Sequence, residues 1–222
     1  MRQIAIDGPA GAGKSTVAKE ISNRMDFMYV DTGAMYRVIG LACIEKGVDI
    51  DDEIAVSAIC KDADIDIRYI DGVQHMFLDG RDVSNEIRQE AVGKAASDIS
   101  KYAAVRKRLV AMQQELGEKY DVVMDGRDIG TKVLVNADLK VYLTASVDCR
   151  ATRRFNELVA KGEECDFEVI KQDIVQRDYN DMNRAISPLC KAEDAIELDT
   201  TDLTVNQVVE AIMNMFEEKN ES

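Results

Sequence analysis

A glycine-rich stretch near the start of the chain, GPAGAGKST at residues 8–16, has the residue types and spacing of a phosphate-binding loop. It satisfies the pattern G-x-x-x-x-G-K-S/T. Glycines let main-chain N–H groups close around phosphate oxygens, the lysine reaches the outer phosphates, and the hydroxyl binds Mg²⁺. We therefore predict that a nucleotide binds to Gly8, Pro9, Ala10, Gly11, Ala12, Gly13, Lys14, Ser15 and Thr16, with Ser15 on the magnesium ion.

A glycine-rich loop of this kind has two alternative interpretations. One is an ordinary turn with a solvated lysine. The other is a dinucleotide-binding turn, which is excluded because Thr16 follows Gly11 and Gly13 where a third glycine is required. A buried strand before the loop and a helical apolar repeat after it favour the phosphate loop.

The segment DTGAMYR, residues 31–37, follows a second apolar run and opens a helix. We predict that Thr32 caps this helix and that Tyr36 and Arg37 lie one turn later on a common side. A capped helix start without a ligand is the plainer alternative. Because Asp31 follows a buried strand, the segment would open at the ligand-binding edge of a sheet, which favours a functional role.

The segment YDVVMDGRDIG, residues 120–130, places Asp125, Arg127 and Asp128 after another apolar run. An acid at this position in a phosphate-loop protein usually lies near the metal or a positioned water. Arg127 is suited to hold an anion through two parallel hydrogen bonds, and Asp128 to accept hydrogen bonds from a polar ligand.

Three arginines, Arg150, Arg153 and Arg154, share one face of the helix expected after residues 141–145. Like charges at this spacing repel one another, so an anion should offset them. A solvated surface paired with glutamates is the alternative.

A last polar cluster lies in residues 176–188, where Arg177, Asp181 and Arg184 fall within a narrow helical arc before Pro188 ends the helix. This set either forms a plain network of ion pairs, or it binds a ribose through the aspartate and a phosphate through the arginines.

The elements that must position these residues follow from the apolar pattern. Apolar runs alternate with helical patterns, and they cover residues 4–6, 28–30, 122–124, 141–143 and 195–198. Such alternation predicts a parallel sheet with helices on both faces, whose ligand lies beyond the C-terminal ends of the strands. Asp7, Asp31, Asp125 and Asp199 each stand at such an end.

Residues 65–84 interrupt this alternation with short strand-like stretches and two Asp-Gly turn signals. We predict a small antiparallel insert, followed by helical residues 85–117. Inserts often carry substrate specificity, although a decorative hairpin fits the same pattern. Residues 204–218 are expected to form a packing helix that begins with a capping box of Thr204 and Gln207.

The composition limits the partners of the protein. A net charge of -14 over 222 residues argues against broad binding to nucleic acid or anionic membranes, so a phosphate ligand needs a local cluster of cations. No two of the five cysteines are closer than 16 residues, which leaves no CxxC spacing, and we place the single His75 at the surface. No apolar run reaches the roughly 20 residues of a membrane span. We expect a cytoplasmic monomer.

The motifs GPAGAGKST, DTGAMYR, AASDIS, AVRKRL, DGRDIGT and RDYNDMNR, in this order and spacing, closely resemble those of the bacterial-type cytidylate kinases, a family of nucleoside monophosphate kinases. The resemblance covers nearly the whole chain. It implies a P-loop NTPase fold with three α/β/α layers and a central five-stranded parallel sheet. It also implies transfer of the γ-phosphoryl group of ATP, with Mg²⁺, to CMP or dCMP.

The same resemblance implies roles for individual residues. ATP would lie on residues 8–16. The catalytic cations would be Lys14, Arg37, Arg127, Arg153, Arg154 and Arg184. The cytosine ring would be recognised by Ser97, Arg106 and Asp128, and the sugar by Asp181 with Arg177. The acceptor phosphate would be clamped by Arg37, Arg127 and Arg184, with Thr32 and Tyr36 lining its site.

The resemblance further implies a single kinase domain over residues 1–222. Its core would comprise residues 1–63, 104–149 and 186–222. A monophosphate-binding insert would occupy about residues 64–103, and a mobile lid about residues 150–185.

Such a kinase needs no general base, because the acceptor phosphate, with a second pKa of about 6, is ionised at neutral pH. The main alternative is a kinase for a sugar-like or shikimate-like hydroxyl group, with Asp31 or Asp125 as the base; the trio Ser97, Arg106 and Asp128 argues against it. A GTPase switch is disfavoured because this sequence has no N-K-x-D motif. An adenylate kinase is disfavoured because those enzymes lack the DGRDIGT motif that is present here.

Overall fold

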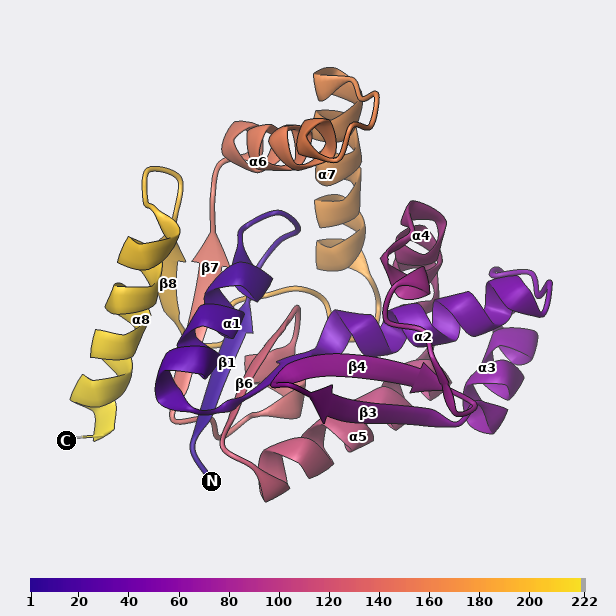
Figure 1. The fold of residues 1–222 in the computed structure, drawn as a ribbon, viewed down its shortest axis with the longest axis horizontal. Helices are drawn as coiled ribbons and strands as arrows, with labels where there is room; N and C mark the ends of the chain where they lie inside the picture. The colour runs from indigo at the N-terminus through magenta and orange to yellow at the C-terminus, as the bar shows by residue number, and fades with distance from the viewer. Residues whose placement is uncertain (221–222) are drawn as a thin grey trace. The chain divides into compact units, whose positions relative to one another are not determined.

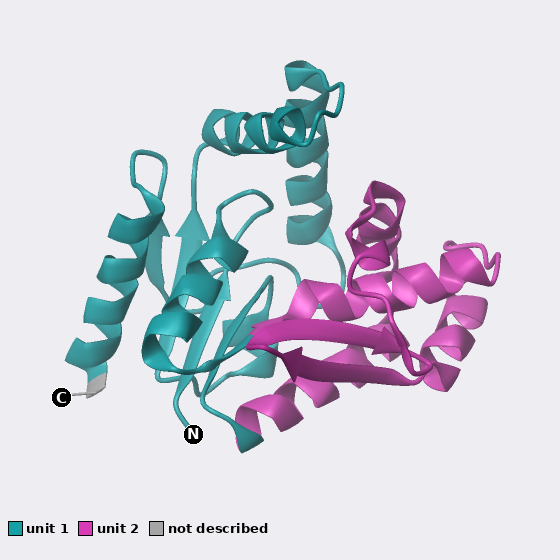
Figure 2. Cartoon of the chain, in the orientation of Figure 1, with its two compact units in different colours: residues 1–29, 119–222 teal, residues 30–118 magenta. Residues whose placement is uncertain are grey.

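The computed structural model describes residues 1–220 and divides the chain into two compact units (Figures 1 and 2). Unit 1 comprises residues 1–29 and the chain from residue 119 onward, and unit 2 comprises residues 30–118. Each unit has its own hydrophobic core.

Unit 1 carries the phosphate loop and the parallel sheet. Its elements are β1 (Gln3–Asp7), α1 (Lys14–Met25), the start of β2 (Met28–Asp31), β6 (Val122–Gly126), the π-helical turn η2 (Ile129–Val133), β7 (Leu139–Thr144), α6 (Val147–Ala160), α7 (Phe167–Asn183), β8 (Ile196–Asp199) and α8 (Val205–Asn220).

The five-stranded sheet has the order β2-β6-β1-β7-β8. β1 pairs in parallel with β6 on one side and β7 on the other, so that Ile4 lies opposite both Val123 and Leu139. β7 pairs in parallel with β8. The five strands lie where the apolar runs predict them, and the predicted central parallel sheet is confirmed.

The strands of unit 1 are apolar because helices cover them. Ile4 and Ile6 are fully buried in β1 and pack with Val17 and Ile21 of α1. Residues of α8 complete this core, and Figure 1 shows α1 and α8 running beside the sheet. The predicted capping box of α8 is confirmed, because the Thr204 and Gln207 side chains each accept a hydrogen bond from the other residue's backbone N–H.

The helices α6 and α7 pack against each other through a small apolar cluster of their own, which includes Ala151, Leu158, Ile170 and Ile174. α7 ends at Asn183, earlier than Pro188 predicts, and Arg184 caps it with an extended backbone. The chain then turns back, so that the Leu189 N–H donates a hydrogen bond to the Asp181 carbonyl oxygen at 2.8 Å, and Arg184 Nε donates one to the Ser187 carbonyl oxygen at 2.6 Å.

Unit 2 contains the predicted antiparallel insert. Its elements are the end of β2, α2 (Thr32–Glu45), α3 (Glu53–Asp62), β3 (Ile65–Ile70), β4 (Val73–Leu78), β5 (Arg81–Asp82), the 3-10 turn η1 (Glu86–Arg88), α4 (Glu90–Ile99) and α5 (Ala103–Lys119). The strands form an antiparallel sheet in the order β3-β4-β5. Both Asp-Gly turns have positive φ at both residues, as the hairpin signal requires.

Helix packing in unit 2 depends on one close approach. A Cβ atom on Gly40 of α2 would lie 3.1 Å from the Ala96 backbone nitrogen of α4, so a larger residue would push the two helices slightly apart. Along the described residues, 1–220, no helix is long and apolar enough to cross a membrane.

Candidate active site

The phosphate loop connects β1 to α1 in a conformation that only glycines allow. Gly8 has a φ of 149°, and a Cβ atom there would lie 2.0 Å from the Leu143 carbonyl oxygen of β7. Gly13, with a φ of 88°, precedes α1 without a side-chain cap. The first N–H groups of α1 therefore have no side chain of Gly13 to satisfy them, which is the arrangement in which helix starts bind anions.

The carbonyl oxygens of this loop face basic side chains. The Pro9 oxygen accepts a hydrogen bond from Lys14 Nζ at 2.7 Å, and the Ala10 oxygen accepts one from Arg150 Nη1 at 2.9 Å. In a trans peptide the carbonyl oxygen and the next N–H point in opposite directions. The N–H groups of Ala10 and Gly11 therefore point away from these cations, as in a loop that binds an anion.

Lys14 is buried, and its surroundings affect its charge. Burial, followed by repulsion from Arg127, lowers the pKa of Lys14 to about 7, although the carboxylates of Asp125 and Asp7 oppose this change. A polyphosphate beside the ammonium would favour its charged form. Lys14 can therefore gain a proton as an anion binds.

Ser15 and Asp125 supply two oxygen donors next to the loop. Ser15 Oγ donates a hydrogen bond to Asp125 Oδ2 at 2.8 Å, and the Tyr29 hydroxyl donates one to Asp125 Oδ1 at 2.8 Å. This pair fits Mg²⁺, which is usually held by one or two protein oxygens together with phosphates and waters. Within residues 1–220, no group of three or more His, Cys, Asp or Glu side chains could hold a metal ion.

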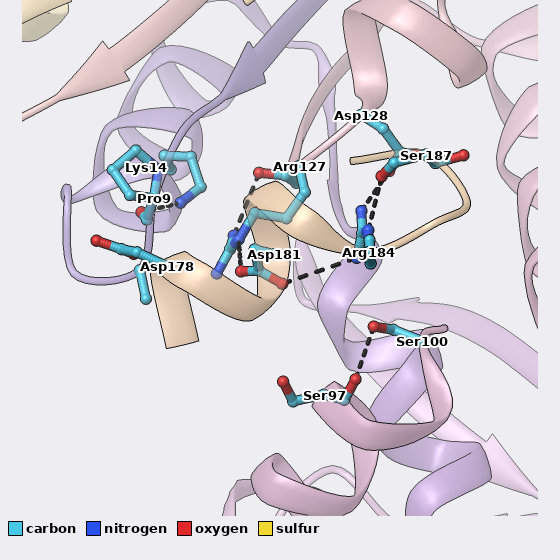
Figure 3. A network of polar contacts seen from close by, with 12 residues as sticks. Pro9, Lys14, Ser97, Ser100, Arg127, Asp128, Asp178, Asp181, Arg184 and Ser187 are labelled. Atoms are coloured by element: carbon cyan, nitrogen blue, oxygen red, sulfur yellow. Dashed lines mark hydrogen bonds and ion pairs between the residues drawn. The ribbon is translucent and has the colours of Figure 1, made fainter. Parts of the chain in front are cut away.

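A cluster of guanidinium and carboxylate groups lies where β6 and α7 end (Figure 3). Arg127 Nε contacts Asp181 Oδ2 at 2.7 Å. Arg184 Nη1 lies 3.7 Å from Asp181 Oδ1, and its Nη2 lies 3.9 Å from Asp128 Oδ1. The structure thus brings together four predicted site residues from two distant segments of the chain.

The electrostatics of this cluster favour the charged forms of Asp181 and Arg127. Burial raises the pKa of the Asp181 carboxyl, but attraction to Arg127, Arg177 and Arg184 outweighs burial and holds this pKa below its usual value. Burial also works against the charged form of Arg127, yet Asp181 raises the pKa of Arg127 above its usual value. The site holds two arginines largely removed from solvent, and guanidinium groups in such a place bind phosphate strongly.

The predicted residues of α6 and α7 differ in their surroundings. Arg153 donates hydrogen bonds to Thr200, at 3.1 Å to its hydroxyl and 2.7 Å to its carbonyl oxygen. Arg154 forms an ion pair with Glu157 at 3.0 Å, which is the solvated alternative. Arg177 is exposed on α7.

Arg150, which donates a hydrogen bond to the Ala10 carbonyl oxygen of the phosphate loop, and its partner Asp178 were not among the predicted site residues. Arg150 Nη2 pairs with Asp178 Oδ2 at 2.7 Å, and both side chains are buried. Asp178 Oδ1 is buried without a hydrogen-bond partner in the described part of the chain. The run of three arginines in α6 was a signal for Arg150, whereas nothing local distinguishes Asp178.

In unit 2, the cap of α2 differs from the prediction. Asp31, not Thr32, is the N-cap: its Oδ1 accepts a hydrogen bond from the Ala34 N–H at 2.9 Å. Its Oδ2 pairs with Arg37 Nη2 at 2.7 Å. Thr32 is instead the buried first residue of the helix. The extended backbone of Asp31 carries its carboxylate to the helix start one residue earlier than predicted.

Two further predicted residues of unit 2 are linked through a serine that sequence reasoning missed. Arg106 is buried, lies with its guanidinium carbon 5.6 Å from the Tyr36 ring centre, and donates a hydrogen bond to the Ser100 carbonyl oxygen at 3.1 Å. The Ser100 hydroxyl donates to the Ser97 carbonyl oxygen at 2.7 Å (Figure 3). Tyr36, Ser97 and Arg106 therefore belong to one polar group.

Solved structures share this fold. A gluconokinase from Sinorhizobium meliloti aligns with a TM-score of 0.50 at 12% identity, over 98% of this chain and 92% of that one. An uncharacterised protein from Eubacterium ventriosum aligns with a TM-score of 0.53 at 12% identity, over 98% and 99%. At this identity the likeness shows the fold alone. Together with the loop at residues 8–16, this architecture defines a P-loop nucleotide-binding fold.

The sequence comparisons narrow this class. The family model for cytidylate kinase matches residues 4–218. Cytidylate kinases from Bacillus licheniformis and Enterococcus faecalis are 49% and 48% identical to this chain, each over 97% of the chain and 96% of the relative. The enzyme of that name from Bacillus subtilis is 46% identical over 98% and 97%. The chain therefore belongs to the cytidylate kinase family.

Proposed function

We propose that this protein catalyses the ATP-dependent phosphorylation of CMP and dCMP to CDP and dCDP. The γ-phosphoryl group passes in line to an oxygen of the acceptor phosphate. The observation that carries the proposal is the cluster of Arg127 and Arg184 held by Asp181 and Asp128, in the unit that contains the phosphate loop. The near full-length similarity to cytidylate kinases supports the same reaction.

The residues of unit 1 are proposed to bring two anions together. The loop from Gly8 to Thr16 holds the triphosphate, with Lys14 on the outer phosphates and Mg²⁺ on Ser15 and Asp125. Arg127 and Arg184 neutralise the acceptor phosphate. Asp181 and Arg177 bind the sugar, and Asp128 accepts a hydrogen bond from the base. Mg²⁺ supplies further charge neutralisation on the phosphates.

The residues of unit 2 are proposed to contribute further contacts to CMP. Arg37 acts on the acceptor phosphate, with Thr32 and Tyr36 beside it. Ser97 and Arg106 recognise the cytosine ring. Residues 64–103 act as the monophosphate-binding insert of a single kinase domain.

Residues 150–185 are proposed to act as a lid, from which Arg153 and Arg154 stabilise the transferred group. The exposed pair of Arg154 with Glu157 contributes at most about 1 kcal/mol, so it can be exchanged for a contact with phosphate. Closure of a lid excludes water and so limits hydrolysis of ATP. A monomeric state and a cytoplasmic location stay predictions.

The proposal is tested by measuring ADP release from purified protein with ATP, Mg²⁺ and a panel of acceptors. We expect CMP and dCMP to be the best acceptors, ahead of UMP and AMP, and gluconate and shikimate to give no more ADP than water does. Faster ADP release with a hydroxyl acceptor than with CMP would contradict the proposal, because phosphorylation of a hydroxyl group requires a general base and not an arginine clamp.

A further inference from the structure

The carboxylate of Asp7 connects the phosphate loop to the segment that carries Arg127 and Asp128. Asp7 is the last residue of β1, directly before Gly8, and is 5% exposed. Its Oδ1 accepts a hydrogen bond from the Ile129 N–H at 2.8 Å, and its Oδ2 accepts one from the Gly130 N–H at 2.8 Å. Both N–H groups belong to the first turn of η2.

A helical turn is usually capped by the side chain of the residue before it, and aspartate is among the best residues for this purpose. The residue before η2 is Asp128, yet its side chain makes no capping hydrogen bond. Asp7 supplies both acceptors instead, from a different strand. The Asp128 carboxylate is turned toward Arg184, with Oδ1 at 3.9 Å from Nη2.

The turn is packed closely onto the Asp7 carboxylate. A Cβ atom on Gly130 would lie 3.4 Å from Asp7 Oδ2 and 3.1 Å from the Cδ of Lys140. Burial, helped by Asp128, raises the pKa of Asp7 to about 6, although the two backbone hydrogen bonds and Lys14 oppose it. A carboxylate whose charge is disfavoured by its surroundings therefore stands at this position.

We propose that Asp7 is a positioning residue for the CMP site: by capping η2 in place of Asp128, it turns the Asp128 carboxylate toward the substrate. The proposal rests on the proposed function of Asp128 in binding the base. When Asp7 cannot accept both hydrogen bonds, Asp128 is expected to cap its own turn and to lose its contact with CMP.

The test is a double-mutant cycle on the full chain, with kcat and the KM values for CMP and ATP measured for each protein. Asp7→Asn and Asp128→Asn are each expected to raise the KM for CMP about tenfold. The KM for ATP should rise much less than the KM for CMP, because the loop glycines and the Lys14 side chain are still present, although Asp7 also favours the charged form of Lys14. The double variant should be little worse than either single variant, because the two residues act through one contact.

Asp138→Asn is the matched control. Asp138 Oδ2 accepts a hydrogen bond from the Gln3 N–H at 2.7 Å, so it has the same chemistry as Asp7 at the opposite end of β1. This variant should leave the KM for CMP unchanged. The same cycle is built with Asp7→Ser, whose shorter, neutral side chain lacks the two carboxylate oxygens, so that the conclusion does not depend on one variant folding well.

The outcomes separate the two proposals. Additive effects of the Asp7 and Asp128 variants, or equal increases in the KM for CMP and the KM for ATP, would overturn the role of Asp7 alone. A wild-type protein that does not use CMP, or an Asp128→Asn variant with an unchanged KM for CMP, would overturn the proposed function and the Asp7 proposal with it.

Discussion

Replacement of Lys14 by alanine is expected to lower kcat with CMP by about a thousandfold or more, while the protein stays folded. Lys14 belongs to the phosphate loop, and its Nζ is held 2.7 Å from the Pro9 carbonyl oxygen. Loss of a preorganised charge of this kind removes stabilisation that is needed where charge develops in the transition state. The measurement is the initial rate of ADP release at saturating CMP.

Folding of the Lys14 variants is not expected to suffer, because the burial that lowers the pKa of Lys14 opposes its charge. Lys14→Met keeps most of the apolar stem and should be as inactive as Lys14→Ala. Lys191→Met is the control, because Lys191 lies outside the site and forms an exposed pair with Glu197 at 3.1 Å. A fully active Lys14→Ala protein would exclude the loop from the mechanism.

Replacement of Arg127 by alanine is expected to lower kcat/KM for CMP by about a thousandfold and to leave the KM for ATP near normal. The guanidinium is proposed to neutralise the acceptor phosphate, so its loss leaves two anions to be brought together with one cation fewer. Arg127→Lys keeps the charge but not the planar pair of donors, and should recover only part of the activity.

The Arg127→Ala substitution also removes the ion-pair partner of Asp181, whose Oδ2 lies 2.7 Å from Arg127 Nε. Breaking a buried pair costs about 3 kcal/mol or more, so rates must be measured well below the melting temperature of the variant. Arg127→Ala combined with Asp181→Asn removes the unpaired charge and should recover stability without activity. Arg24→Ala, which breaks ion pairs with Glu20 of α1 and Glu210 of α8, should keep full activity. Equal losses for CMP and ATP binding would contradict the assignment.

Much of the fold was predictable because it is encoded locally. The apolar runs that become β1, β6 and β7 are buried on both faces, so they stand out from the polar residues that follow them. The Asp-Gly turns of the antiparallel insert are local signals as well. The spacing of glycine, lysine and serine was enough to predict the phosphate loop.

The contacts that complete the site could not be predicted in this way, because they join distant segments. Asp7 accepts hydrogen bonds from Ile129 and Gly130 only because β1 pairs with β6 in one register. Arg150 meets Asp178 only because α6 packs against α7. The predicted N-cap of α2 was wrong because Asp31 and Thr32 are both good capping residues, and the local backbone conformation decides between them.

The central claim is that guanidinium groups bind an acceptor that is already an anion. It is tested most directly by calorimetry of CMP and of cytidine, which lacks the phosphate, with the wild-type protein and with Arg127→Ala. We expect the wild-type protein to prefer CMP strongly, and the substitution to weaken CMP binding by about 10- to 100-fold while cytidine binding changes less than about twofold. Equal weakening of both ligands, or an unchanged preference for CMP, would contradict the account.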